Sequence, residues 1–298
     1  RDSYYIVENG ESFYLHAGES VPIEDFEVPR VRHNFKETSD DKAAWDSLMK
    51  AIAEGISSGE MTKVVSSREV EFTSETPYNV ASILANLVDN NPNCFIFGYE
   101  KDGRTFVGAS PEILVRHRGS EILSYALAGT APKDGPNAWT EEQLLTNTKN
   151  IIEHNIVRDR IVNTMKQITP DVTVGETGIM ELSHLYHLRT IITAKDSTKS
   201  LVEWAKLLHP TPALGGEPRE KALALLQEYE SHERGMYAAP FGFMKDMGDG
   251  IVVVAIRSAL IMDNVLYAYA GCGVVADSDA DEEYAETNNK MRTILDAL

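Results

Sequence analysis

YAGCGVVADSDADEEYAETNNK, residues 269–290, joins an apolar strand to a helix through a glycine-rich strand end and a turn rich in aspartate. Glu283, Glu286 and Lys290 follow at spacings of three and four residues, which places their charges on one face of the helix. The glycines let a ligand approach the backbone closely, and the aspartate-rich turn suits a helix start. Two carboxylates and an ammonium could hold a metal ion and an anionic substrate there, although such a pair standing alone is more often a solvated acidic face.

The composition describes a globular and strongly acidic protein. The chain has 298 residues, 43% of them hydrophobic, which suffices for one large domain or two ordinary ones. Its net charge of −18 argues against nucleic acid or an anionic membrane as a partner, and no apolar run reaches the roughly 20 residues of a membrane span. Cys94 and Cys272 lie in apolar contexts and predict buried thiols in a cytoplasmic protein. An anionic substrate must therefore meet local positive charge or a bound cation.

Strand-like and helix-like segments follow one another without the strict alternation of a parallel sheet. Residues 1–37 are predicted as a strand pair and an extended linker, and 41–60 as an amphipathic helix. Residues 141–169 are predicted as one long helix, and 250–263, GIVVVAIRSALIMD, as one strand. The sequence has no internal repeat, GxGxxG, P-loop, CxxC or HExxH. These patterns predict an α+β fold with a large antiparallel β-sheet core flanked by helices.

Two residues that are far apart in the chain could carry acid–base chemistry. Lys63 begins a mostly apolar strand, where a lysine usually lies at the surface but a buried one can act as a general base. Glu112, in GASPEILV, heads a strand that otherwise faces a core, and taken alone it is more often an exposed edge charge. Only the fold could bring the two together.

Other candidates are polar residues in small-residue or apolar surroundings. Gly129 and Thr130 end a strand and could offer backbone amides to a carboxylate, or could form a plain turn. Glu153 could be a third oxygen ligand for Mg²⁺ if its helix faces the helix that carries Glu283 and Glu286. Arg257 interrupts an apolar run, and a buried arginine needs a partner such as a carboxylate. Four histidines show no zinc spacing and are predicted to be structural or to support residues of the site from behind: His154, His184, His187 and His209.

Together these segments resemble the chorismate-utilising enzymes, the family of anthranilate, aminodeoxychorismate, isochorismate and salicylate synthases. The matching stretches occur in the family's order: TKVVSSR, FVGASPEILV, ALAGT, NTKNIIEH, LHPTPALGG, ERGMYAAPFG, VAIRSAL and the stretch quoted first. The resemblance implies a fold like that of anthranilate synthase component I, with a chorismate-binding catalytic domain at 41–298. Residues 1–40 are then expected to be the remnant of a longer N-terminal region with a linker, in an N-terminally truncated chain.

The resemblance also implies a role for each candidate. Lys63 matches the base that activates water for attack at C2 of chorismate, and Glu112 matches the acid that protonates the departing C4 hydroxyl. The acidic positions around a Mg²⁺ ion, which neutralises a substrate carboxylate, are matched by Glu153, Glu283 and Glu286. The positions that contact the substrate are matched by Gly129, Thr130, Ala213, Tyr237, Ile256, Arg257, Gly273 and Lys290.

Within the family, LHPTPALGG and AIRSAL resemble isochorismate synthase. Ala213 stands where some aminating or salicylate-forming members have threonine, which points to water as the nucleophile and to no obligatory glutaminase subunit. YAAPFG and AGCGVVADSD resemble the menaquinone-pathway enzymes more than the siderophore ones. Asn150 replaces a frequent aspartate one turn before Glu153, which removes a charge. Two alternatives stay open: a salicylate synthase, which also eliminates pyruvate, and an inactive fragment that binds chorismate.

Overall fold

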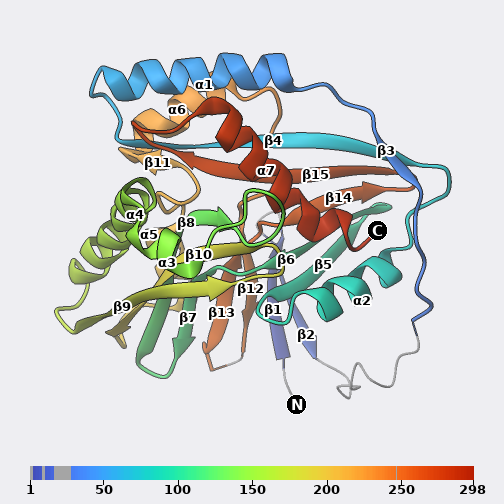
Figure 1. Cartoon of the computed structure of the whole chain (residues 1–298). Coiled ribbons are helices and arrows are strands. Elements are labelled where there is room, and N and C mark those ends of the chain that lie inside the picture. Colours follow the sequence, from blue (N-terminus) through green and yellow to red (C-terminus); the bar gives the residue numbers. More distant parts are fainter. Residues whose placement is uncertain (1–2, 9–10, 17–27, 246) are drawn as a thin grey trace.

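The computed structural model describes residues 3–8, 11–16, 28–245 and 247–298. Its centre consists of two sheets whose strands run at a steep angle to each other, with helices along their outer faces and ends (Figure 1). Every strand pairing among the described residues is antiparallel. The predicted α+β class and antiparallel core are confirmed, but the core is built from two sheets rather than one.

The first sheet has six strands in the order β12-β13-β7-β8-β10-β9. Their bounds are Pro240–Met244 for β12, Gly250–Val254 for β13, Ile113–Arg118 for β7, Glu121–Pro132 for β8, Leu185–Lys195 for β10 and Val172–Glu181 for β9. The central strand β8 is buried along most of its length because elements cover both of its faces, whereas β9 at the edge is largely exposed.

The second sheet has seven strands in the order β11-β4-β15-β14-β6-β5, with β3 also paired to β4. Their bounds are Gly216–Glu217 for β11, Lys63–Ser74 for β4, Val265–Val274 for β15, Ser258–Met262 for β14, Arg104–Ser110 for β6, Phe95–Lys101 for β5 and Phe35–Glu37 for β3. The two longest strands, β4 and β15, pair along almost their whole length, so that Val64 lies opposite Val274.

Seven helices surround the sheets in the described part of the chain. They are α1 (Lys42–Ser57), α2 (Val80–Asn90), α3 (Glu141–Thr146), α4 (Thr148–Lys166), α5 (Leu201–Leu208), α6 (Arg219–Tyr229) and α7 (Ala280–Leu295). In Figure 1, α7 crosses β15 while α1 lies along the top beside α6, and α4 packs against β8. The largest cluster of buried apolar side chains draws on both sheets and on α4 and α5, and includes Phe106, Val115, Ile161 and Trp204.

The single strand predicted for residues 250–263 is wrong. The segment forms β13 in the six-stranded sheet and β14 in the seven-stranded sheet, and residues 255–257 carry the chain from one to the other. Arg257 stands at the corner with a φ of +53°, a backbone conformation that β-strands do not use. Its carbonyl accepts a hydrogen bond from the Ala109 amide at 3.0 Å, which anchors the corner to the end of β6. An unbroken apolar pattern hid the break because both halves are buried.

The single long helix predicted for residues 141–169 is also wrong, because it divides into α3 and α4 at Asn147. The backbone of Asn147 is extended, with a ψ of 118°, and its side chain accepts a hydrogen bond from the Asn150 amide at 3.0 Å, which makes it the N-cap of α4. The sequence analysis did not identify the exposed edge strand β9, which follows α4.

The N-terminal strand pair is confirmed as β1 (Ser3–Glu8) and β2 (Glu11–His16). Of the linker expected after it, residues 17–27 lie outside the described part of the chain. None of the described helices combines the length and apolar character that a membrane crossing requires.

Candidate functional site

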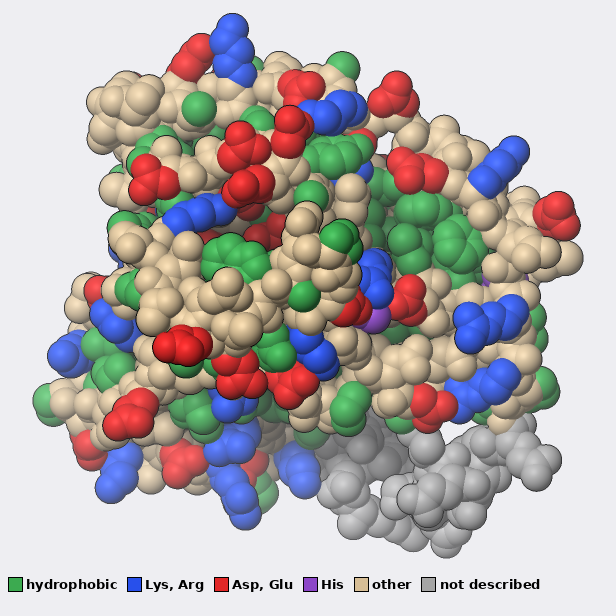
Figure 2. Space-filling view, viewed as in Figure 1, with side chains coloured by type: hydrophobic (Ala, Val, Ile, Leu, Met, Phe, Trp, Pro, Cys, Tyr) green, Lys and Arg blue, Asp and Glu red, His purple; other side chains and the backbone are tan. Residues whose placement is uncertain are grey.

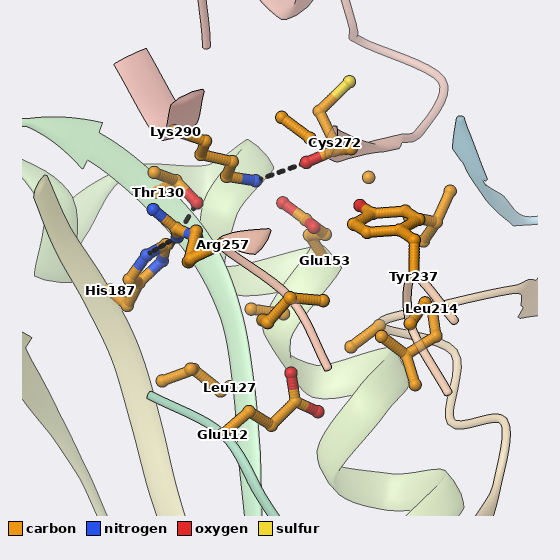
Figure 3. Close-up of a pocket in the computed structure, with 18 of the residues that line it drawn as sticks. Glu112, Leu127, Thr130, Glu153, His187, Leu214, Tyr237, Arg257, Cys272 and Lys290 are labelled. Carbon is orange, nitrogen blue, oxygen red and sulfur yellow. Dashed lines mark hydrogen bonds between the residues drawn. The ribbon is translucent and has the colours of Figure 1, made fainter. Parts of the chain in front are cut away.

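A pocket with about 620 Å³ of empty space lies where the two sheets meet, and both sheets, α4 and α7 contribute to its wall (Figure 3). Nine of the residues predicted from the sequence line it: Glu112, Thr130, Glu153, Ala213, Tyr237, Ile256, Arg257, Gly273 and Lys290. Four do not reach its surface: Lys63, Gly129, Glu283 and Glu286. The tertiary structure thus gathers most of the predicted site from distant parts of the chain.

Glu112 points into the pocket from the turn before β7, at the end away from Lys290 (Figure 3). The turn is held by the Glu112 amide, which donates to Ser110 Oγ at 3.2 Å, and by the Glu112 carbonyl, which accepts from the Val254 amide at 3.1 Å. The side chain is 2% exposed, and its Oε1 has no hydrogen-bond partner among the described residues. Burial raises the pKa of Glu112 to about 8 although Lys63 and other cations oppose the shift, so the carboxyl group is mostly protonated at neutral pH.

Arg257 is held by His187, one of the histidines predicted to be structural or to support residues of the site. Its Nη2 lies 2.6 Å from His187 Nε2, and His187 Nδ1 lies 3.0 Å from Thr130 Oγ1. Burial and the charge of Arg257 hold the pKa of His187 well below its ordinary value. The imidazole is therefore neutral: Nε2 accepts from the guanidinium, and Nδ1 carries the proton and faces the threonine hydroxyl. Spacing gave no sign of this contact, because the register of β8 against β10 is what brings His187 opposite Thr130.

The prediction that the backbone amide of Thr130 binds a substrate carboxylate needs a correction. Its amide already donates to Asn150 Oδ1 at 3.0 Å, so its hydroxyl, rather than its N–H, is the group left to serve the pocket. Asn150 Nδ2 in turn donates to Asn147 Oδ1 at 2.9 Å, which ties the end of β8 to the start of α4. Gly129 has a φ of +79° and lies directly on this helix, since a Cβ there would be 3.0 Å from the Asn150 carbonyl oxygen.

Each of the three predicted metal-binding carboxylates is paired with a lysine. Lys63 Nζ lies 3.0 Å from Glu153 Oε1, and Lys290 Nζ lies 2.6 Å from Glu286 Oε1. Glu283 pairs with Lys149, a residue of α4 that the sequence analysis did not select. We call these six residues the carboxylate–lysine cluster. Figure 2 shows acidic side chains gathered over the first turns of α7, which is the surface above it.

Gly273 creates the space for this cluster. A Cβ at that position would lie 2.1 Å from Glu153 Oε1 and 2.7 Å from Lys63 Cε, so any larger residue would displace the ion pair. The glycine selected for close ligand approach thus also lets the strand β15 approach a side chain from α4. Lys63 itself is fully buried behind this strand, with no exposed surface.

The carboxylates suit a hard divalent cation by their chemistry. Burial raises the pKa of Glu283 to about 7, the charges of Glu286 and Glu153 add to the shift, and Lys149 opposes it. Three mutually repelling carboxylates are the oxygen donors that Mg²⁺ prefers. No three His, Cys, Asp or Glu side chains converge on a single point within the described ranges, and the carboxylates are turned to their lysines instead.

Tyr237 and Arg234 form the wall beside the apolar part of the pocket. Tyr237 stacks on Tyr269 with ring centroids 5.5 Å apart, and burial raises its pKa, so the phenol is neutral. Arg234, which the sequence analysis did not select, donates from Nη1 to the Leu214 carbonyl at 2.6 Å and from Nη2 to the Val65 carbonyl at 2.7 Å. These bonds join the loop after α5 to β4, and apolar side chains complete the wall: Leu127, Ala213, Leu214 and Ile256.

Comparison with known proteins gives one consistent family. Residues 18–298 match the family model described as chorismate binding enzyme. The chain is 36% identical over 264 residues to isochorismate synthase MenF of Bacillus subtilis, a match covering 87% of this chain and 56% of that protein. The structure of MenF from Escherichia coli, the menaquinone-specific isochorismate synthase, aligns with a TM-score of 0.80 and 30% identity over 90% of this chain and 65% of that one.

Anthranilate synthase component I of Streptococcus pneumoniae has the same fold, with a TM-score of 0.76 and 25% identity over 93% of this chain and 62% of that one. The fold is therefore common to proteins named for different reactions. The chain spans a little over half the length of the Bacillus subtilis relative.

Proposed function

The chain belongs to the chorismate-binding enzyme family, and we propose that it converts chorismate to isochorismate in a Mg²⁺-dependent reaction. In this reaction water adds at C2 of the ring, the ring double bonds shift, and the C4 hydroxyl leaves. One water enters and one departs, so the step needs no oxidant and no second substrate. The proposal rests on the residues of the pocket together with the similarity to isochorismate synthases.

The observation that carries the proposal is the protonated Glu112. A hydroxyl leaves a carbon readily only if it takes a proton, and a general acid works best when its pKa lies near the working pH. A carboxyl group with a pKa of about 8 keeps its proton at neutral pH, and Glu112 holds it inside the pocket. Glu112 therefore delivers the proton to the C4 oxygen.

Lys63 is the proposed base that takes a proton from the attacking water. It is fully buried and 3.0 Å from Glu153, a residue of the pocket wall, so its amine approaches the substrate from behind Gly273. Lys63 begins β4 and Glu112 lies in the turn before β7, so the base and the acid come from different elements of the pocket. This assignment is tested directly by Lys63→Ala, which abolishes turnover under the proposal.

The substrate is a dianion, and two groups of residues receive its carboxylates. Arg257 and Tyr237 bind one of them, with the Thr130 hydroxyl as a further donor, and the neutral His187 keeps the guanidinium in place. The other carboxylate lies toward Lys290 and the carboxylate–lysine cluster. Glu153 and Glu286, with Glu283 beside them, would hold Mg²⁺ there, and the ion would neutralise charge on the substrate carboxylate.

Water rather than ammonia is the proposed nucleophile. Ala213 and its neighbour Leu214 line the pocket, and their apolar side chains offer no donor or acceptor to ammonia. The proposal places this activity in the cytoplasm, in menaquinone biosynthesis, on the strength of the similarity to MenF proteins.

The test is to incubate the protein with chorismate and Mg²⁺ and to separate the products by chromatography. Isochorismate as the sole product supports the proposal, whereas salicylate and pyruvate identify a lyase in the same pocket. Unchanged chorismate, with binding of chorismate retained, shows that this chain binds the substrate without turning it over. Lys63→Ala, folded as judged by circular dichroism, serves as the inactive control.

A further inference from the structure

The carboxylate–lysine cluster contains three acidic and three basic side chains, so its charges balance without a metal ion. Glu153, Glu283 and Glu286 each pair their Oε1 with one lysine, so an ammonium lies beside every carboxylate that a divalent cation would contact. A divalent cation can bind several of these carboxylates only if at least one lysine gives up its partner. The structure therefore raises the question of which lysine leaves.

The three lysines differ in how easily they can move. Lys63 is fully buried, with 0% of its side chain exposed to solvent. Lys290 is 12% exposed, and its ammonium also donates to the Gly271 carbonyl at 2.8 Å, which holds it when Glu286 turns away. Lys149 is the most exposed of the three at 23%, and within the described ranges its ammonium forms one ion pair, with Glu283. Lys149 is thus the ammonium that reaches solvent at the lowest cost.

The position of Lys149 on its own helix supports the same assignment. It lies in the first turn of α4, where the helix dipole and the unpaired amides repel a positive charge. What opposes this repulsion is the partner on α7, since Glu283 is 1% exposed and would otherwise be a buried carboxylate without a counter-charge. The negative charges of Glu286 and Glu153 also attract the Lys149 ammonium, so all three carboxylates of the cluster stabilise its positive charge.

We propose that Lys149 is an internal counter-ion that occupies the electrostatic place of the divalent cation and is displaced to solvent when the cation binds. This inference rests on the proposed Mg²⁺ site. In the metal-free protein the Lys149 ammonium compensates the charge of Glu283 and the repulsion among the three carboxylates. The affinity for Mg²⁺ is then set by the exchange of an ammonium for the ion, so Lys149 lowers it.

The test is a calorimetric titration of substrate-free protein with MgCl₂ at pH 8.5, where proton competition for carboxylates is small. Lys149→Gln removes the competing charge and is expected to bind Mg²⁺ about tenfold more tightly than the wild type, a change that corresponds to about 1.4 kcal/mol. Lys149→Arg keeps the charge and adds a planar fork that holds a carboxylate with two hydrogen bonds, so its affinity falls below that of the wild type. Thermal unfolding with and without Mg²⁺ gives a second readout, in which Lys149→Gln shows the largest stabilisation by the ion.

Lys133→Gln is the matched control, because it removes a lysine that pairs with Glu181, at 2.7 Å, outside the cluster. Its affinity for Mg²⁺ is expected to stay within twofold of the wild type. Equal or weaker binding by Lys149→Gln, in a variant that unfolds cooperatively, overturns the exchange while leaving the metal site intact. Absence of Mg²⁺ binding in the wild type and in every variant overturns the metal site itself, and the exchange with it.

Discussion

Glu112 and Glu153 face the same pocket from opposite sides and are both buried, at 2% and 8% exposure, yet their electrostatic surroundings differ completely. Glu112 forms no ion pair with any described residue, and burial turns it into a carboxylic acid that keeps its proton near neutral pH. Glu153 lies 3.0 Å from an ammonium and belongs to a cluster of charged pairs. The comparison shows that the partner, rather than the residue type or the depth of burial, decides whether a glutamate in this pocket is an acid or a ligand.

The largest expected effect is the loss of activity when Glu112, the glutamate without an ion pair to any described residue, is replaced. Glu112→Gln keeps the shape of the side chain and loses the proton, so kcat falls about 10³-fold. Because a neutral amide replaces a neutral acid, the free energy of unfolding changes by less than about 1 kcal/mol below pH 4.5, where the unfolded chain is protonated as well. Steady-state kinetics and urea denaturation measure the two quantities. Activity within tenfold of the wild type would exclude Glu112 as the acid.

The same substitution at Glu153, the glutamate that is paired with a lysine, is expected to lower stability. Glu153→Gln leaves the fully buried Lys63 without its carboxylate, and the free energy of unfolding falls by about 3 kcal/mol. The matched variant is Glu286→Gln, since Lys290 retains the Gly271 carbonyl and partial exposure, and it loses clearly less. Equal losses for both variants, measured by urea denaturation, would contradict the difference between the two ion pairs.

The pH dependence of stability sharpens the contrast at Glu112. Its pKa rises from the ordinary value of 4.5 to about 8 on folding, so the native protein keeps a proton that the unfolded chain releases. This contribution is complete below about pH 4.5 and is lost as the pH rises through 8. Relative to Glu112→Gln, the wild type therefore loses on the order of 4 kcal/mol between pH 5 and pH 8.5. Urea denaturation at both pH values tests this, and a difference that does not change with pH contradicts the raised pKa.

The smallest effect is expected from removing the Thr130 hydroxyl, which is one of several proposed hydrogen-bond donors to the substrate. Thr130→Val preserves the backbone amide bond to Asn150 but leaves the N–H of His187 without its acceptor, at a cost of about 1 kcal/mol in stability. KM for chorismate rises about fivefold, as for the loss of one hydrogen bond, while kcat changes little. Thr130→Ser retains the hydroxyl and behaves as the wild type. If serine is as impaired as valine, packing of the methyl group, and not the hydrogen bond, accounts for the effect.

Much of the fold and site could be predicted because the signals are local. The strand, turn and helix at residues 269–290 follow from glycines, a capping aspartate and helical spacing, and the observed N-cap is Asp279. Buried polar residues such as Arg257 stand out against apolar neighbours in the sequence. The order of the motifs supplied the family, and nine predicted residues line one pocket.

The sequence by itself determined the α+β class, the residues able to perform acid–base and metal chemistry, and the helical face that carries Glu283, Glu286 and Lys290. Only the tertiary structure decided that residues 250–263 divide between two sheets, that His187 holds Arg257, and that the Thr130 amide is already occupied. It also decided the pairing of Lys63 with Glu153 and of Lys149 with Glu283. The physical reason is that periodicity assigns a side chain to a face of its own element, whereas partners come from sheet register and helix packing between distant segments.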